Sequence, residues 1–327
     1  MPNPGRLDIT DGNTTDGNTA RGVSPRAYRR VVLVAGALLT LIVFTGALVR
    51  LTESGLGCED WPTCSEEEFA PEWGFHPWIE FGNRLLSGVV SVGVGLAVLQ
   101  AYRRSPRRTD LIRWSWYLVA GVVAQIVLGG ITVLLDLHPL LVSSHFLLSM
   151  VLLWATAVLF YKAKGDYGPP TPTLPPHLVK HSRWTVIATS ALLFTGTMVT
   201  GTGPNSGDFR ADRLGFDLGD VARVHGLTAW VTLMSLVMLA VRMQREGTAP
   251  TALQAPIGVA VLQGLLGYIQ YNLGLPPTLV MAHIVGAVVF FLLVLRMHLG
   301  FFERPVEGAE PNELPPRVHP DRDLARG

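Results

Sequence analysis

Two histidines in the C-terminal part of the chain, His225 and His283, have the residue type and the setting for chemistry. Each stands near the start of a long hydrophobic segment, at a similar depth. These segments are the second and the fourth of a group of four, so both side chains could project into the core of a four-helix bundle. Paired imidazoles in such a core favour axial ligation of a heme iron.

Two plainer interpretations compete with heme ligation. A histidine in a membrane helix often only hydrogen-bonds a neighbouring helix, and a single histidine would be interpreted in that way. Copper or zinc is the weaker alternative, because no Cys, Asp or third His obviously completes such a site. Two histidines at matched depth, one of them repeated elsewhere in the chain, favour the heme.

The repeated histidine belongs to an internal sequence repeat. Residues recur at a constant offset of 138, which is the separation of His145 and His283, and six of seven matched pairs are identical. The other matched pairs are Gln125 and Gln263, Gly129 and Gly267, Thr132 and Gln270, Pro139 and Pro277, Leu141 and Leu279, and Val142 and Val280. A further stretch from Thr45 to Val49 recurs at Thr195 to Val199. Each half is therefore predicted to hold four helices.

The position that matches His225 in the N-terminal half is Asn83, so the two halves differ in chemistry. Asn83 is a poor iron ligand, and a heme held by His145 alone would keep an open coordination position. A closed bis-histidine heme transfers electrons, whereas an open one can do chemistry on the ring or on oxygen. This difference predicts an electron carrier in the C-terminal half and a reaction site in the N-terminal half.

Glu80 is the candidate catalytic residue of that reaction site. It shares one helix face with three other polar residues, which are His76, Asn83 and Ser87. An ionisable residue at the edge of the hydrocarbon is a functional candidate. The alternative is that Glu80 only forms an ion pair with Arg84 or Arg50, or is solvated at the interface.

The elements that position these residues are expected to be transmembrane helices. The chain has 327 residues, of which 49% are hydrophobic and 16% are charged, whereas a soluble protein carries roughly 25% charged residues. A bilayer span needs roughly 20 mostly apolar residues. Eight segments qualify, at 31–49, 78–100, 114–135, 139–161, 184–202, 221–241, 252–273 and 278–299. The net charge of +1 argues against a nucleic-acid partner.

We therefore predict an all-α membrane protein built from two pseudo-symmetric four-helix bundles. An even number of helices in each half makes the repeats parallel, related by an axis along the membrane normal. The expected divisions are a disordered cytoplasmic N-terminus (1–30), the N-terminal half (31–161), a cytoplasmic linker (162–183), the C-terminal half (184–300) and a disordered cytoplasmic tail (301–327).

The distribution of charge predicts the orientation. Lys and Arg gather in the loops on one side, which the positive-inside rule assigns to the cytoplasm. The loop after the first span is acidic, with Glu53, Glu59, Asp60, Glu66, Glu67, Glu68 and Glu72. We expect a multi-pass protein of the cell membrane, surrounded by lipid, with both termini cytoplasmic and the active site near the outer face.

Cys58 and Cys64 lie six positions apart in the acidic outer loop. The outside of a bacterial membrane permits disulfides. A bond between the two would pin the loop over the N-terminal site, and its alternative role is that of a structural staple with no redox function. Two cysteines are too few for a disulfide scaffold or a Cys-rich metal cluster.

These motifs resemble those of the heme A synthase family, of the CtaA type, in an actinobacterial-like variant. The longest motif runs from Thr45 to Cys64 and reads TGALVRLTESGLGCEDWPTC. The others are IEFGNR at 79–84, Gln125 to Val133 followed by Pro139 and His145, and His225 with Gln263 to Gly267 and His283. The resemblance covers roughly residues 30–300.

The resemblance implies an enzyme that oxidises the C8 methyl of heme O to the formyl of heme A, which serves cytochrome oxidase. It implies a heme b cofactor bound by His225 and His283 and a substrate heme O bound through His145. The family's Glu-x-x-His motif reads Glu80-x-x-Asn83 here, so this chain departs from the family's pattern at the histidine that would be the second ligand of the substrate heme.

The resemblance also assigns roles around the substrate. It implies that Glu80 is essential for the oxidation and that Cys58 and Cys64 form a disulfide. Arg84 stands in the same motif and is a weaker candidate at the substrate heme. Expected partners are a heme O synthase, cytochrome oxidase assembly factors and an electron acceptor.

Two other classes of function compete with the enzyme. A diheme b-type cytochrome that only transfers electrons would need paired histidines in both halves, and Asn83 argues against it. A transporter would place its polar residues near the membrane midplane. The ionisable residues here gather near the outer face instead.

Overall fold

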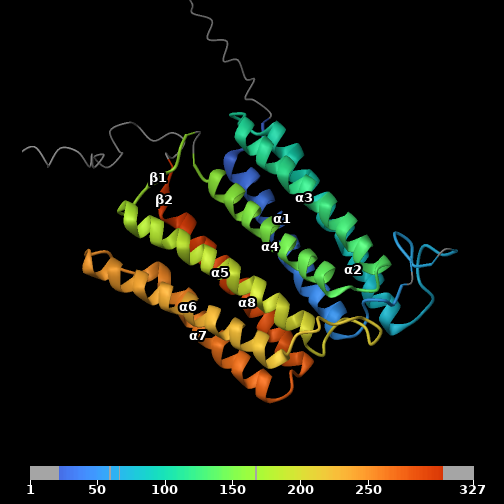
Figure 1. The fold of residues 1–327 in the computed structure, drawn as a ribbon. Helices are drawn as coiled ribbons and strands as arrows, with labels where there is room; N and C mark the ends of the chain where they lie inside the picture. Colours follow the sequence, from blue (N-terminus) through green and yellow to red (C-terminus); the bar gives the residue numbers. More distant parts are fainter. Residues whose placement is uncertain (1–21, 59, 66, 166–167, 305–327) are drawn as a thin grey trace, which may run out of the picture.

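The computed structural model describes residues 22–58, 60–65, 67–165 and 168–304. Over these residues the chain forms eight long helices and one two-stranded sheet (Figure 1). The helices are α1 (Pro25–Leu51), α2 (Phe75–Arg103), α3 (Thr109–Leu134), α4 (Pro139–Lys162), α5 (Pro176–Thr202), α6 (Leu218–Arg245), α7 (Thr251–Asn272) and α8 (Pro277–Gly300). All eight are long and apolar enough to cross a membrane. The predicted all-α fold with eight spans is confirmed.

The starts of the helices follow from local sequence. Proline occupies the first turn of α1, α4, α5 and α8, where its missing N–H would have had no partner in the helix anyway. Side chains cap two other N–H groups: Ser24 accepts a hydrogen bond from the Ala27 N–H at 3.2 Å, and Asp217 accepts one from the Asp220 N–H at 2.9 Å.

The outer parts of the chain differ from the predicted divisions. Helix α1 begins at Pro25, so residues 25–30 are helical and not part of a disordered segment. Strands β1 (Thr171–Pro172) and β2 (Phe302–Glu303) pair, which joins the linker to the start of the predicted tail. Helix α5 begins at Pro176, within the predicted linker. The predictions of disorder for 1–21 and 305–327 lie outside the described residues.

The two halves share one packing scheme. In the first half, α1 contacts α2 and α4, and α3 contacts the same two helices. In the second half, α5 contacts α6 and α8, and α7 contacts the same two. Each half is therefore a square bundle in which the second and fourth helices stand on a diagonal. The halves meet where α4 packs against α5 and α8, and where α1 packs against α8.

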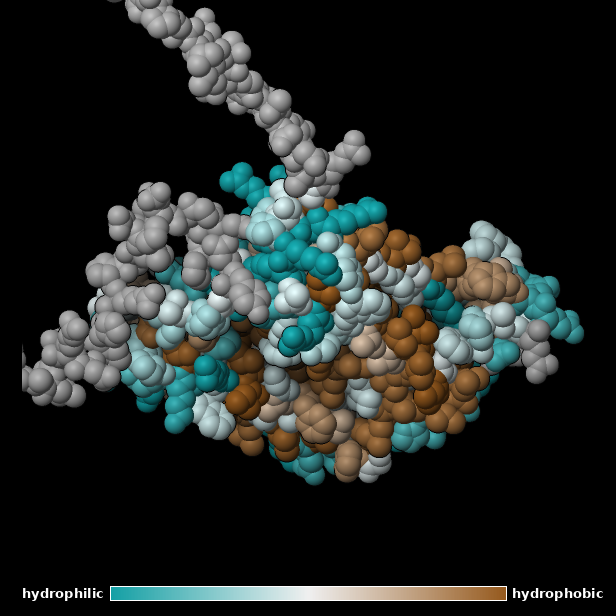
Figure 2. Space-filling model, turned by 90° about the horizontal axis from the view of Figure 1, so that it is seen from above, coloured by the Kyte–Doolittle hydropathy of each residue, from teal (hydrophilic) through white to brown (hydrophobic). Residues whose placement is uncertain are grey.

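The apolar side chains fill the bundle and also cover its outside. One buried cluster begins in the first half with Tyr28 and Val32 and continues into the second half with Leu193, Val288 and Phe291. Large apolar residues such as Leu33 and Trp230 are exposed on the helices. Figure 2 shows hydrophobic residues over a broad area of the face in view. Such a surface matches lipid, which leaves helix contacts to close packing and hydrogen bonds.

One end of the bundle, which we call the disulfide end because it holds Cys58 and Cys64, joins the halves through backbone contacts. Arg50 donates hydrogen bonds to the carbonyls of Thr200 at 2.7 Å and Asn205 at 2.6 Å. The Gly55 N–H donates to the Gly207 carbonyl at 3.0 Å. These bonds fix the loop after α1 against the loop after α5.

The loop after α5 is further held by an ion pair. Asp208 is buried, and Arg210 donates to its carboxylate at 3.0 Å. Burial alone would raise the pKa of the Asp208 carboxyl, but the hydrogen bonds and charge of Arg210 outweigh burial and hold this pKa below its usual value. Arg210 also donates to the Leu56 carbonyl at 3.2 Å, so the pair connects the two loops.

Candidate functional site

The C-terminal bundle brings the rings of His225 of α6 and His283 of α8 together across its diagonal, in an edge-to-face arrangement. Their ring centroids are 6.3 Å apart, and the ring planes meet at 79°. Two imidazoles that bind one metal ion from opposite sides, at about 2 Å each, place their ring centroids roughly 6 Å apart. The rings are therefore spaced as two axial ligands of one metal ion would be.

A hydroxyl network orients His225. Thr195 of α5 lies 3.1 Å from its Nδ1, and the same hydroxyl lies 2.9 Å from that of Thr228. A ligand histidine commonly uses its second nitrogen for such a bond, which fixes the ring and leaves the other nitrogen for the metal. On His283, Nδ1 is buried and has no hydrogen-bond partner among the described residues.

Glycines on neighbouring helices make room for three histidine rings. A Cβ atom on Gly196 would lie 3.2 Å from Cε1 of His225, and one on Gly267 would lie 3.3 Å from Cε1 of His283. In the N-terminal half, a Cβ atom on Gly129 would lie 3.2 Å from Cε1 of His145. These contacts are tighter than ordinary packing, so a larger residue would press on the ring. The repeat contained these glycines, but their contact with the histidines became visible only in three dimensions.

The N-terminal bundle places Asn83 of α2 and His145 of α4 on the same diagonal as the histidine pair of the other half. His145 has a buried Nδ1 with no hydrogen-bond partner in the described ranges, as His283 does. Asn83 accepts a hydrogen bond through Oδ1 from the hydroxyl of Thr45 on α1, at 2.7 Å. Thr45 thus contacts Asn83 as Thr195 contacts His225, which agrees with the predicted repeat.

Glu80 is buried at the disulfide end of α2, with 5% of its surface exposed. The Cys58 N–H donates to Oε2 at 2.8 Å, and Arg84 Nη2 lies 2.5 Å from Oε1. The ion pair with Arg84 that the sequence left open is therefore present, whereas Arg50 bonds to backbone carbonyls elsewhere. A carboxylate held by a charge and a backbone N–H has a fixed position, which both a structural and a catalytic role would need.

Arg84 also ties Glu80 to the loop that the cysteines close. Its Nη1 donates to the carbonyls of Asp60 at 2.8 Å and Thr63 at 2.7 Å. Cys58 and Cys64 form a disulfide in the structure, as expected, and both are buried. The loop, the disulfide and the Glu80–Arg84 pair thus form one connected unit.

Trp61 places this loop over the N-terminal bundle. A Cβ atom on Gly130 of α3 would lie 2.7 Å from the Trp61 ring, and Gly130 adjoins the Gly129 that contacts His145. The prediction that a disulfide-bonded loop covers the N-terminal site agrees with this contact. His76, in contrast, is exposed at the start of α2, where Nδ1 lies 2.9 Å from the Ser54 hydroxyl.

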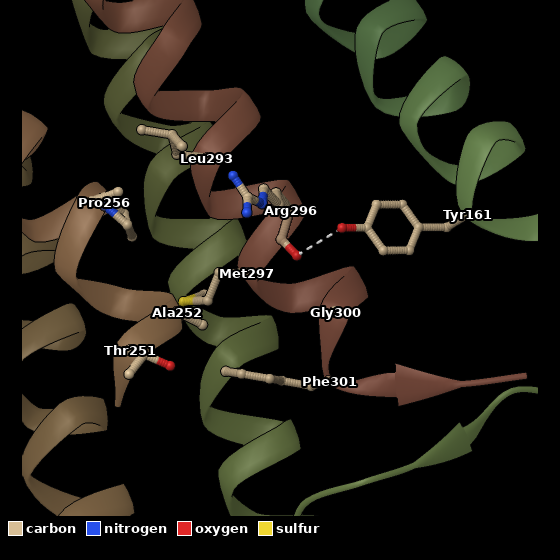
Figure 3. A pocket seen from close by; sticks show the side chains of 10 residues that line it. Tyr161, Thr251, Ala252, Pro256, Leu293, Arg296, Met297, Gly300 and Phe301 are labelled. Atoms are coloured by element: carbon tan, nitrogen blue, oxygen red, sulfur yellow. Dashed lines mark hydrogen bonds between the residues drawn. The ribbon is translucent and has the colours of Figure 1, made fainter. Parts of the chain in front are cut away.

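A cavity at the opposite end of the molecule contains none of these residues. It measures about 220 Å³ and is lined by the ends of α4 and α8 and the start of α7. In Figure 3 the Tyr161 hydroxyl points to the backbone carbonyl of Arg296, a hydrogen bond of 3.3 Å. The histidines and Glu80 lie near the disulfide end, so this cavity is separate from the candidate site.

A bare metal ion has too few protein ligands in these bundles. Over the residues that the structure describes, no three His, Cys, Asp or Glu side chains gather where they could hold one ion. A catalytic zinc usually has three protein ligands. A heme iron needs only axial ligands, because the porphyrin supplies the other four, and two facing histidines are enough.

Comparison with known proteins gives one family. Residues 29–204 match the family COX15-CtaA, described as cytochrome oxidase assembly protein. The chain is 35% identical over 106 residues to a heme A synthase of Geobacillus thermodenitrificans, which covers 32% of this chain and 33% of that protein. It is 27% identical over 122 residues to a heme A synthase of Oceanobacillus iheyensis, covering 36% and 39%. The chain thus spans about a third of the length of the curated relatives that it matches.

Proposed function

The chain belongs to the COX15-CtaA family of cytochrome oxidase assembly proteins, and we propose that it is a heme A synthase, which oxidises the C8 methyl of heme O to a formyl group. The observation that carries the proposal is the unequal pair of bundle sites. One has two facing histidines, and the other has a single histidine beneath a buried carboxylate and a disulfide-bonded loop. Names of the matched relatives agree with this activity.

In this proposal His225 and His283 hold heme b. The residues fit that group, since the ring spacing of 6.3 Å suits two axial ligands and Thr195 orients one of the rings. When bound, heme b supplies a redox centre that can pass electrons away from the reaction. The protein contributes two imidazoles, of which Thr195 orients one, and with both bound the iron would have no position open for a reactant.

His145 holds the substrate heme O in the N-terminal bundle. With water as the source of the oxygen atom, oxidation of its methyl group to a formyl group releases four protons and four electrons, and the electrons pass to an acceptor. Positive charge that develops beside the ring is stabilised by a nearby carboxylate, which can also accept a proton. Glu80 is a buried carboxylate of this half, and Arg84 and the Cys58 N–H hold it in place.

The proposal includes the orientation of the protein in the membrane and its partners. The disulfide end faces outward and both termini are cytoplasmic, because the loops rich in Lys and Arg lie at the opposite end. Heme O reaches the N-terminal bundle from a heme O synthase, and the product passes to cytochrome oxidase assembly factors. An electron acceptor completes the reaction, and lipid surrounds the eight helices.

Pigment analysis tests the proposed activity. The chain is expressed with a heme O synthase in a host that makes no heme A, and the hemes are extracted with acid and acetone and separated by HPLC. We expect heme A in the membranes and heme b together with heme O or heme A in the purified protein. A heme-free protein would instead favour a transporter, and heme b alone in both halves would favour an electron-transfer cytochrome.

Removing the disulfide should slow the proposed reaction. In the double variant Cys58→Ser with Cys64→Ser, the loop that contacts Glu80 and Arg84 loses its closure. Heme A formation should fall roughly 10- to 100-fold, because small displacements of a catalytic group are costly. Heme b in the C-terminal half should stay unchanged, as measured by its absorbance.

A mass-spectrometric control accompanies that measurement. A non-reduced digest of the unaltered protein should contain the two cysteine peptides joined, and reduction should separate them. If the double variant makes heme A at the normal rate, the disulfide is a staple that does not position Glu80.

A further inference from the structure

Two pairs of repeat-related glycines lie around the two sites, and one of these four glycines has no ring to contact. Gly196, Gly129 and Gly267 each lie against a histidine ring. Gly46 is the repeat counterpart of Gly196, and a Cβ atom there would meet nothing within 4 Å. The space that the His225 ring occupies in one half is therefore open in the other, next to Asn83.

The amide of Asn83 has a defined orientation at the edge of this space. Its Oδ1 accepts from Thr45, so that side of the amide is engaged. Among the described residues Nδ2 takes part in no hydrogen bond, and the side chain is only half-buried. An amide nitrogen is a donor, so it can bond to an acceptor atom placed in the open space.

On the basis of the proposed function, we propose that this open space binds a small hydrogen-bond-accepting ligand between Asn83 and the iron of the substrate heme, opposite His145. The ligand class is a diatomic molecule, water or hydroxide. His145 supplies one axial ligand, Asn83 donates to the small ligand, and Thr45 holds the amide in place.

The two other candidate side chains of α2, His76 and Glu80, are engaged elsewhere. His76 lies at the exposed start of α2 and is hydrogen-bonded to Ser54. Glu80 is engaged by Arg84 and the Cys58 N–H. The C-terminal heme has no such opening, because His225 fills the equivalent space. The two hemes of one molecule should therefore differ in their response to an added ligand.

Carbon monoxide is the probe for this difference. The full chain is purified with heme in both halves, reduced with dithionite and titrated with carbon monoxide while absorbance and the C–O stretching frequency are recorded. We expect one of the two hemes to bind the gas. Asn83→Leu should keep binding but raise the stretching frequency, because the amide donor is lost.

Asn83→His should abolish this binding and add a second low-spin heme signal, because the new imidazole enters the open space. A double variant that adds Gly46→Ala to Asn83→His should bind carbon monoxide again. A Cβ atom on the equivalent Gly196 would lie 3.2 Å from the His225 ring, so a Cβ atom at position 46 should crowd the new imidazole in the same way. Each variant is also checked for heme content, so that a misfolded protein is recognised.

Two results separate this inference from the proposed function. If both hemes of the unaltered protein are low-spin and neither binds carbon monoxide, the open position does not exist, whatever the activity. If carbon monoxide binds equally well after Asn83→His, the ligand lies elsewhere and the inference is wrong. If the protein binds carbon monoxide as expected but makes no heme A, the result supports the ligand site and contradicts only the proposed function.

Discussion

Glu80→Gln is expected to lower heme A formation by about 100-fold or more, the usual contribution of a positioned acid or base. Heme O or its hydroxylated intermediate should accumulate instead. Gln keeps the shape of the side chain and can still accept from the Cys58 N–H, but it carries no charge and cannot take a proton at neutral pH. The effect should therefore fall on the reaction and leave the fold unchanged.

The measurement uses the heme content of membranes that make heme O. Heme b bound by the C-terminal half should be present at the normal level, because Glu80 lies in the other bundle. Glu72→Gln is a matched control, since Glu72 is an exposed acid near the same end of the molecule. Its heme A formation should equal that of the unaltered protein.

A substitution of Arg84 distinguishes a catalytic role of Glu80 from a role only as the ion-pair partner of Arg84. Arg84→Lys keeps a positive charge beside Glu80 but cannot reach the carbonyls of Asp60 and Thr63 in the same geometry. If Glu80 served only as the partner of Arg84, Glu80→Gln and Arg84→Lys should both lower the amount of folded protein and leave its specific activity unchanged. Normal heme A formation by Glu80→Gln would exclude the catalytic role.

Much of the arrangement could be predicted from the sequence. Long apolar segments follow from composition alone, and a repeat that matches His145 with His283 sets two bundles of the same design. The similar depth of His225 and His283 in the bundle could be predicted from their positions near the helix starts, because a helix has a fixed rise per residue. Such features depend on the side-chain pattern along a single segment, which a sequence displays directly.

Other parts of the site could not be predicted. The bond from the Cys58 N–H to Glu80 involves a backbone group, and every residue except proline has that group. Arg84 likewise bonds to carbonyls of the loop, whose positions depend on how the loop folds. The glycine contacts with histidine rings depend on the rotation of neighbouring helices about their axes, and the sequence pattern does not fix that rotation to a few tenths of an ångström.

The second large effect should come from the facing histidines. His225→Ala and His283→Ala are each expected to remove the low-spin heme b spectrum, because the iron loses one of its two axial ligands. Thr195→Val should have a smaller effect, with heme affinity reduced about 10- to 100-fold, the usual result when a group that orients a metal ligand is removed. Redox-titrated absorbance of the purified protein measures each change.

A third histidine of the same half provides the control. His177 stands at the opposite end of α5, where its exposed ring contacts Glu246, so His177→Ala should leave the heme b spectrum unchanged. Gly196→Ala tests the same geometry without touching a ligand, because its Cβ atom would lie 3.2 Å from the His225 ring and should disturb the low-spin signal. An unaltered low-spin spectrum in both histidine variants would show that the pair only links α6 to α8, since an imidazole that binds no iron can be removed without changing the heme.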